Sequence, residues 1–276
     1  MPALSLIAVL AAALLHASWN LVLKSSSERL VTGASQLALG GLAFLPVLVW
    51  RGFPTEALPY LLLSGVVQVG YVYALATAYD RADLSFVYPI ARGSAPVLIA
   101  LGAFFGFSDS LQGLGWLALA LICGGVLIIG LAAPSRRGAE WSLITGSLIA
   151  AYVTIDGAGV RQTDDTVAYV GALTLITTVM LVPLTLVLRG QQVVKAVVKA
   201  EWRSQLLAGA ASMASYGLLL YASRSAPLSL VSAARESGVL FATLLGWWFL
   251  DERVTRSRWI AALLIASGVV LLALGR

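Results

Sequence analysis

Charged side chains are scarce in this sequence. Only 11% of its 276 residues are Asp, Glu, Lys or Arg, whereas 59% are hydrophobic. A soluble domain carries roughly 25% charged residues and needs a polar surface, so a soluble, secreted or disordered protein is excluded. The net charge of +5 is spread thinly between apolar runs, which argues against nucleic-acid binding.

Chemically reactive groups are also few. The chain has one cysteine, Cys123, and one histidine, His16, so it can form neither an internal disulfide nor a metal site from these residues. It lacks the Gly-x-x-x-x-Gly-Lys motif of ATP-driven pumps. An intramembrane serine protease is not supported, because the residues around Ser94 do not match the motif of a nucleophilic serine. An intramembrane aspartyl protease needs two facing Asp residues, and only Asp156 lies within an expected span. We therefore expect no enzyme activity, no cofactor and no metal.

Long apolar runs fill most of the chain, and the polar breaks between them are short. A helix needs ~20 apolar residues to cross a bilayer. The unbroken runs indicate helices, because the strands of a membrane barrel would alternate apolar and polar residues. We predict an all-α integral membrane protein with ten transmembrane helices. The expected spans cover residues 2–23, 31–50, 58–79, 84–107, 112–133, 142–160, 167–188, 204–223, 228–250 and 259–275.

The basic residues predict the orientation in the membrane. Most loop lysines and arginines fall on one side, among them Arg136, Arg137 and Lys195, whereas Arg51 and Arg161 belong to the other side. The side richer in Lys and Arg is normally cytoplasmic. We therefore expect a multi-pass protein of a bacterial-type inner membrane with both termini outside, in the periplasm.

An internal repeat is the strongest signal in the sequence. Residues 75–131 align with residues 219–275 without a gap, over two spans and the loop that joins them. The start of the chain repeats as well, because Ser-Leu-Ile at 5–7 recurs at 142–144. Similarity at a fixed spacing indicates that one structural unit occurs twice.

The repeat divides the chain into two halves of five spans, 1–134 and 135–276. Five is an odd number, so the second half has to enter the membrane upside down. Two inverted five-helix repeats are the build of secondary transporters, which bind their substrate near the bilayer midplane between the repeats.

The repeated motifs resemble those of the drug/metabolite transporter superfamily, EamA branch. They are the Leu-Ser-x-Val starts at 84–87 and 228–231 and the Gly-x-x-x-Leu-x-Glu pattern at 246–252. In the first half the acidic residue is displaced, since Ser108 stands in its place and Asp109 follows. The resemblance implies a ten-helix exporter of small metabolites that works by alternating access. Within this family the chain resembles the YddG-like amino-acid exporters.

Three ionisable side chains inside spans are candidates for the binding site. Arg92 in the fourth span aligns with Glu236 in the ninth, and Arg235 precedes Glu236. Charges within a bilayer usually pair or line a cavity. One interpretation is a structural ion pair, either Arg92–Glu236 or one centred on Arg235 and Glu236, that holds the halves together. The other is that an arginine binds a substrate carboxylate while Glu236 lies near a substrate ammonium.

The fourth span also contains Pro89 and Pro96. Each proline removes a backbone donor, and a broken helix in a membrane normally lines protein or a wet cavity, so both are expected hinges. Tyr88 lies four residues before Arg92 and shares its helix face. We expect Tyr88 at the substrate site.

Polar and aromatic residues of other spans complete the expected site. They are His16, Trp19, Gln68, Tyr71, Tyr79, Tyr152, Asp156, Ser212 and Tyr216. His16 has the alternative of a hydrogen-bonded core residue. Asp156 has the alternatives of an ion pair with Arg161 and of a protonation site coupled to transport.

We expect a secondary transporter that exports small metabolites, foremost amino acids, because the spans hold both positive and negative groups. The alternative is a proton-coupled exporter of drugs or cationic compounds, driven through Glu236 or Asp156. The expected partners are the small-molecule substrate and membrane lipid, with no nucleic acid. The chain is expected to be a monomer or a homodimer.

Overall fold

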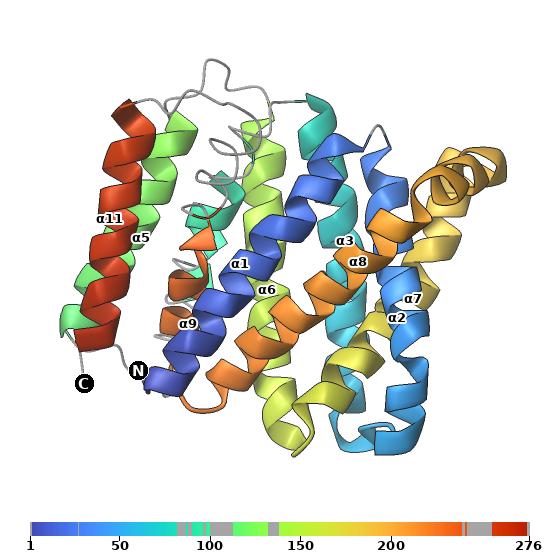
Figure 1. Ribbon diagram of the computed structural model, residues 1–276, viewed down its shortest axis with the longest axis horizontal. Helices are drawn as coiled ribbons and strands as arrows, with labels where there is room; N and C mark the ends of the chain where they lie inside the picture. Colours follow the sequence, from blue (N-terminus) through green and yellow to red (C-terminus); the bar gives the residue numbers. More distant parts are fainter. Residues whose placement is uncertain are drawn as a thin grey trace.

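The structure is a computed structural model, and it describes residues 2–26, 28–81, 87, 90–95, 98–99, 113–131, 138–238, 241 and 256–274. Within these residues all regular secondary structure is helical, and the long helices pack against one another (Figure 1). The α-helices are α1 (Ala3–Ser25), α2 (Arg29–Arg51), α3 (Leu58–Arg81), α5 (Gly113–Leu131), α6 (Ala139–Gly159), α7 (Thr166–Arg189), α8 (Gln191–Ser223), α9 (Leu228–Arg235) and α11 (Arg256–Leu274). The short 3-10 helices are η1 (Thr55–Ala57), before α3, and η2 (Val160–Gln162), after α6.

Six helices in the described part of the chain are long and apolar enough to cross a membrane, namely α1, α2, α3, α6, α7 and α8. Shorter apolar segments, Gly113–Gly125 and Trp259–Gly268, lie in α5 and α11. Most of the expected span 84–107 and about half of the expected span 228–250 fall outside the described residues. The all-helical prediction is thus confirmed, and the count of ten spans stays a prediction.

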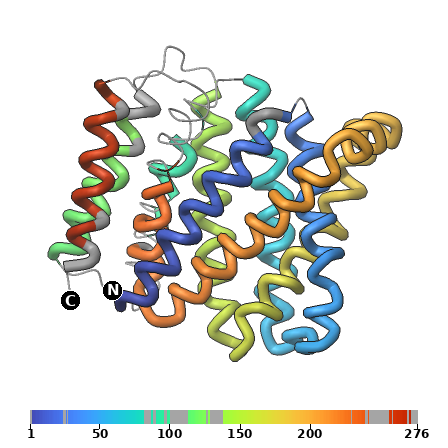
Figure 2. The backbone as a smooth tube through the Cα atoms, in the orientation of Figure 1, coloured from blue at the N-terminus to red at the C-terminus, as the bar shows by residue number. Residues whose placement is uncertain are grey.

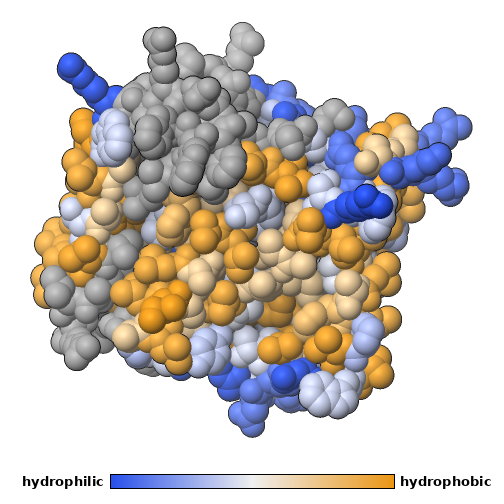
Figure 3. All heavy atoms as spheres, in the orientation of Figure 1, coloured by the Kyte–Doolittle hydropathy of each residue, from blue (hydrophilic) through white to orange (hydrophobic). Residues whose placement is uncertain are grey.

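The visible face of the molecule carries a broad apolar band. Figure 3 shows hydrophobic side chains across the middle of the visible face and hydrophilic ones at its upper and lower margins. Val187 and Leu207, on α7 and α8, are 82% and 72% exposed. Apolar surface of this extent suits contact with lipid, since a soluble protein rarely exposes large apolar patches.

Helices α2 and α7 end in the same way. Each contains a proline in its second half, Pro46 or Pro183, and each ends in an Arg-Gly pair. The two glycines, Gly52 and Gly190, have φ angles of 87° and 80°. L side chains rarely adopt such angles. The local sequence therefore specifies the same helix ending at two distant places in the chain.

Helices from the first half of the chain pack between helices from the second half. Helix α1 packs along α8, α3 along α6, α2 along both α7 and α8, and α5 along α11, and Figure 2 shows α5 beside α11. At the α2–α8 contact, a Cβ atom on Gly40 would lie 3.1 Å from the backbone carbonyl carbon of Gly209. Two glycines thus let these helix backbones approach closely. Each of these pairs joins a helix that ends before residue 132 to one that starts after residue 138.

Candidate functional site

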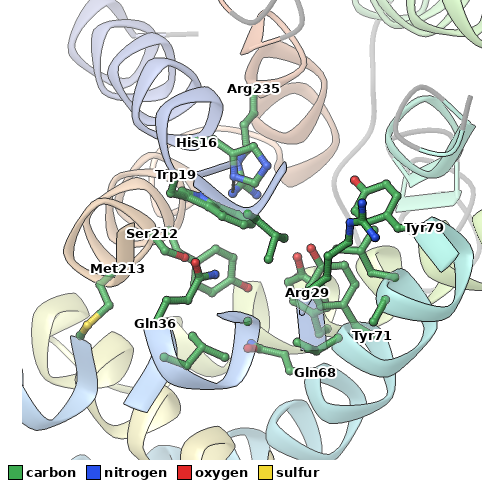
Figure 4. A pocket seen from close by; sticks show the side chains of 18 residues that line it. His16, Trp19, Arg29, Gln36, Gln68, Tyr71, Tyr79, Ser212, Met213 and Arg235 are labelled. Atoms are coloured by element: carbon green, nitrogen blue, oxygen red, sulfur yellow. Dashed lines mark hydrogen bonds between the residues drawn. The ribbon is translucent and has the colours of Figure 1, made fainter. Parts of the chain in front are cut away.

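A cavity lies between α1, α2, α3, α6, α8 and α9, and Figure 4 shows the side chains that line it. It offers about 90 Å³ to the centres of water-sized spheres, which is room for several water molecules. Its lining mixes aromatic rings, aliphatic side chains, two glutamines and two arginines. A mostly apolar cavity with a few convergent polar groups is the usual form of a small-molecule site.

The cavity extends toward one end of the helix bundle. Arg29, at the start of α2, and Tyr79, near the end of α3, both line it. The Arg29 side chain is 35% exposed, so the lining reaches the surface at this end, which is the upper end in Figure 1. We call this the Arg29 end.

Most of the residues that the sequence proposes for a substrate site line this cavity. They are His16, Trp19, Gln68, Tyr71, Tyr79, Tyr152, Ser212, Tyr216 and Arg235. Arg92, Asp156 and Glu236 are buried but are not among the lining residues. Tyr88 lies outside the described residues.

His16, on the cavity wall, contacts two buried arginines, Arg92 and Arg235. Arg235 Nη2 lies 2.8 Å from His16 Nδ1, and Arg92 Nη2 contacts His16 Nε2. A neutral imidazole has a single acceptor nitrogen, and guanidinium groups only donate. His16 can therefore satisfy one of the two arginines at a time.

Glu236 is the carboxylate of this cluster. Its Oε1 lies 3.6 Å from Arg92 Nη1, and the two side chains are 4% and 5% exposed. The ion pair that the repeat alignment suggested is present in the structure. It links the segment before α5 to the segment after α9, so it connects the two halves of the chain.

Helix α9 stops at this cluster without a proline. It covers Leu228–Arg235, and the next two N–H groups, of Glu236 and Ser237, bond to carbonyl oxygens three residues back. The sequence predicted a span at 228–250 and hinges at Pro89 and Pro96. The prolines lie outside the described residues. The turn at Glu236 and Ser237 interrupts the helix within the expected ninth span. The C-terminal carbonyl dipoles of α9 are placed to stabilise the neighbouring cations.

Arg235 differs from Arg92 in its partners. Its guanidinium lies 5.9 Å above the centre of the Tyr216 ring, and its hydrogen-bonded neighbour is His16. Its Nε has no hydrogen-bond partner, and no carboxylate of the described residues lies within ion-pair distance of it. Arg235 is thus a buried cation on the cavity wall that shares a cluster with Arg92 and Glu236 but forms no ion pair with a carboxylate of the described residues.

Asp156 forms a second cluster on the other side of Tyr216. The carboxylate is fully buried and accepts hydrogen bonds from the hydroxyls of Tyr169 (2.8 Å) and Tyr216 and from the amide of Gln68 (3.3 Å). Arg161 donates to the carbonyl oxygen of Ser223 instead. The local Asp156–Arg161 pair is therefore replaced by three uncharged donors from α3, α7 and α8.

Tyr216 connects the two clusters, because its ring faces Arg235 and its hydroxyl binds Asp156. Sequence reasoning missed Tyr169 and Gln36. Gln36 carries a signal that could have found it, since it is a polar residue inside an apolar span like Gln68. Tyr169 has no such signal, because tyrosine near a span end is common at membrane interfaces.

A short ion pair ties α2 to α7 at the lower end in Figure 1. Arg51 Nη1 lies 2.6 Å from Asp165 Oδ2, and Asp165 also caps α7 by accepting from the N–H groups of Val167 and Ala168. Partial burial alone would raise the pKa of Asp165, but these N–H groups and the Arg51 guanidinium hold it below the usual aspartate value.

Further hydrogen bonds close the same end. Arg224, after α8, donates to the carbonyl oxygens of Val160 (3.2 Å) and Thr163 (2.8 Å). The hydroxyls of Ser5 and Ser225 lie 2.8 Å apart and join α1 to the segment after α8. The end opposite the Arg29 end is therefore held by short contacts.

The Arg29 end is held by longer ion pairs. Asp80 lies 3.8 Å from Arg29 and 3.5 Å from Arg189, and Arg81 lies 3.4 Å from Glu140. These side chains are 35–71% exposed, and exposed pairs of this kind contribute at most about 1 kcal/mol each. Among the described residues, the shortest ion pair, Arg51–Asp165, thus lies at the end opposite the Arg29 end, where the exposed Arg224–Asp164 pair measures 3.6 Å.

The C-terminal half of the chain carries the family signature, because residues 137–274 match the family described as "EamA-like transporter family". The chain belongs to the EamA-like transporter family. Members of this family are membrane transporters of the drug/metabolite type rather than enzymes, so this EamA-like chain is a multi-pass membrane transporter.

Solved structures support the fold of this EamA-like protein. One, described only as "Crystal structure of protein", has a TM-score of 0.80 at 17% sequence identity, covering 99% of this chain and 98% of that chain. At this identity the likeness shows the fold alone. No curated protein matches the chain.

Proposed function

We propose that the protein is a secondary transporter that exports small metabolites, foremost amino acids, across the inner membrane by alternating access. The observation that carries this proposal is Arg235, a buried cation on the cavity wall that forms no ion pair with a carboxylate of the described residues. Burying a charge is costly unless an opposite charge accompanies it. An anionic group of a substrate would supply that charge.

The rest of the cavity suits a zwitterion with a small side chain. A guanidinium binds a carboxylate through two parallel N–H groups. The carboxylate of Asp156 lies beyond Tyr216 and adds negative potential on the far side of the cavity. The rings of Tyr71 and Tyr152, 5.3 Å apart, offer apolar and aromatic surface to a side chain.

The helix pairing supports two inverted halves, 1–134 and 135–276, within a ten-helix protein. The sequence repeat relates α1 to α6 and α3 to α8, so the pair α1–α8 corresponds to the pair α6–α3, and both pairs are present. The corresponding helices α2 and α7 pack on each other, as do α5 and α11. The matching Arg-Gly ends of α2 and α7 add to this symmetry.

The difference between the two ends supports alternating access. The cavity reaches the surface at the Arg29 end, where the ion pairs are long, and short contacts close the other end. The Arg29 end also contains Arg81 and Arg189, which the positive-inside rule assigns to the cytoplasm. We infer an inward-open state with both termini outside, ready to load substrate from the cytoplasm.

A proton-coupled exporter of cationic compounds is the alternative, and Asp156 favours it. This carboxylate is fully buried and has only uncharged donors around it. A buried carboxylate without a cation can exchange a proton or attract a cationic substrate.

The test uses the purified protein in liposomes and a panel of labelled amino acids. Uptake is measured with and without a pH gradient for the wild type, for Arg235→Gln and for Arg203→Gln as a control. Arg203 is an arginine of α8 that lies over Trp202, away from the cavity. We expect saturable amino-acid uptake that Arg235→Gln lowers at least tenfold and that the control retains.

The two candidate functions differ in outcome. Cationic dyes moved under a pH gradient, with no amino-acid uptake, would refute the amino-acid proposal and support the alternative. Amino-acid uptake that is the same in Arg235→Gln and in the wild type would refute the role of Arg235.

A further inference from the structure

Three polar groups on the cavity wall have no hydrogen-bond partner. They are the Nε1 of Trp19, the Oε1 of Gln36 and the Nε of Arg235, and they come from α1, α2 and α9. Their side chains line the same cavity, and the residues are only 7%, 4% and 6% exposed. Figure 4 shows them reaching the cavity from different helices.

Buried polar groups are normally paired, so each exception needs an explanation. The remaining unpaired buried groups of the described residues, on Thr177, Thr178, Gln205 and Ser237, do not line the cavity. Two donors and one acceptor are thus left open around one space. They are complementary to a ligand that accepts at one end and donates at the other.

We propose that Gln36, Trp19 and Arg235 form a subsite for the head group of an α-amino acid. The indole N–H of Trp19 and the Nε–H of Arg235 donate to the carboxylate, and the Gln36 carbonyl oxygen accepts from the ammonium. This assignment rests on the proposed function, and it adds the group that recognises the amine.

In this proposal Gln36, rather than Glu236 as the sequence suggested, binds the ammonium group of the substrate. Glu236 is paired with Arg92, and neither residue lines the cavity. The uncharged amide of Gln36 adds no carboxylate that could pair with Arg235, so the Nε–H of Arg235, which has no hydrogen-bond partner, stays available for the substrate. A carboxylate at position 36 would compete with the substrate for Arg235.

The backbone at Gln36 is held in place by the contact between α2 and α8. Its carbonyl oxygen approaches Gly209 so closely that a Cβ atom there would collide with it. A polar group on a packed helix is positioned more accurately than one on a loop. Gln36 therefore presents a pre-positioned acceptor to the ligand.

The test compares three ligands that differ at one group. For phenylalanine these are phenylalanine itself, 3-phenyllactate, which has a hydroxyl for the ammonium, and phenethylamine, which lacks the carboxylate. If another panel member is transported better, its own α-hydroxy acid and amine are used. Each is measured as a competitor of amino-acid uptake into liposomes.

We expect the wild type to prefer the amino acid over the hydroxy acid, and Gln36→Leu to raise the KM for the amino acid roughly ten- to hundredfold. A hydrogen bond to a charged group has this value. The inhibition constant (Ki) of the hydroxy acid, measured as a competitor of amino-acid uptake, should change much less. The matched control is Gln205→Leu, because Gln205 is an equally buried, unpaired glutamine of α8 that does not line the cavity. Its KM should equal that of the wild type.

The outcomes separate this proposal from the proposed function. If amino acids are transported but Gln36→Leu and Gln205→Leu have the same KM, the Gln36 subsite is refuted and the amino-acid exporter stands. If the wild type transports no amino acid, the proposed function itself fails. If Gln36→Leu does not fold, the wild-type competition decides, since equal inhibition by amino acid and hydroxy acid rules out recognition of the ammonium.

Discussion

The buried pair of Arg92 and Glu236 permits a quantitative test of the central cluster. Replacing Glu236 by Gln removes the carboxylate that lies 3.6 Å from Arg92, with both side chains at most 5% exposed. Two guanidinium groups then remain around His16 without the charge of Glu236. The change keeps the size of the side chain, so packing is conserved.

The expected cost follows from the burial of both charges. Removing one partner of a buried pair costs about 3–5 kcal/mol, whereas replacing both by apolar groups of similar volume is often close to neutral. We expect Glu236→Gln to lower the free energy of unfolding by about 3 kcal/mol, because the amide retains one hydrogen bond. For a chain of this size that corresponds to a Tm lower by roughly 6–12 °C.

The assay is thermal unfolding in detergent, followed by the fluorescence of the tryptophans. The comparison is a double-mutant cycle with Arg92→Met, Glu236→Leu and the two combined. The double variant should be more stable than Glu236→Gln alone. If the double variant is the least stable of the set, the cluster does not depend on charge neutralisation and the reasoning is wrong.

Three other expectations concern separate parts of the molecule. Asp165→Ala should lower the free energy of unfolding by about 1–2 kcal/mol near neutral pH, because it removes a helix cap and an exposed ion pair. The pKa of Asp165 is lowered in the folded state, so the stability advantage of the wild type should shrink as the pH falls below about 4. A difference in unfolding free energy that stays constant with pH would contradict this. Asp156→Asn keeps the shape of the side chain, so uptake that no longer responds to a pH gradient would identify the proton site, and unchanged coupling would exclude Asp156. Gly209→Ala should lower the free energy of unfolding by about 1–3 kcal/mol, because the new Cβ would collide with the backbone carbonyl oxygen of Gln36. The control is Gly217→Ala, whose Cβ would meet only a side chain, at 3.8 Å. It should have the same Tm as the wild type.

Composition alone predicts the helical membrane class, because so few charges cannot cover a soluble surface. The limits of the helices follow less directly. The expected span 204–223 is part of a longer helix, α8, that begins at Gln191. The additional segment carries Lys195, Lys199 and Arg203, and hydropathy detects the length that suits a bilayer rather than the length of the helix.

The candidate site shows a similar division. Periodicity places residues such as Gln68 and Tyr71 on one helix face, and polarity inside apolar spans indicates that this face meets a cavity. The choice of partners depends on how the helices rotate and cross, which a single sequence does not contain. For this reason the pairing of Glu236 with Arg92 rather than Arg235, and the joining of Asp156 to Tyr169, emerge only from the structure.

The interleaved helix pairs also govern how the protein can be made. Every strong pairing described here joins an early helix to a late one, so α1 meets α8 only after about 200 more residues have been synthesised, roughly 10–40 s at ordinary translation rates. Until its late partner has been made, α6 for α3, α7 for α2 and α8 for α1, each of these helices lacks the packing described above. During this interval the incomplete chain is exposed to quality-control proteases. A change in the last helices also removes packing contacts from the first ones.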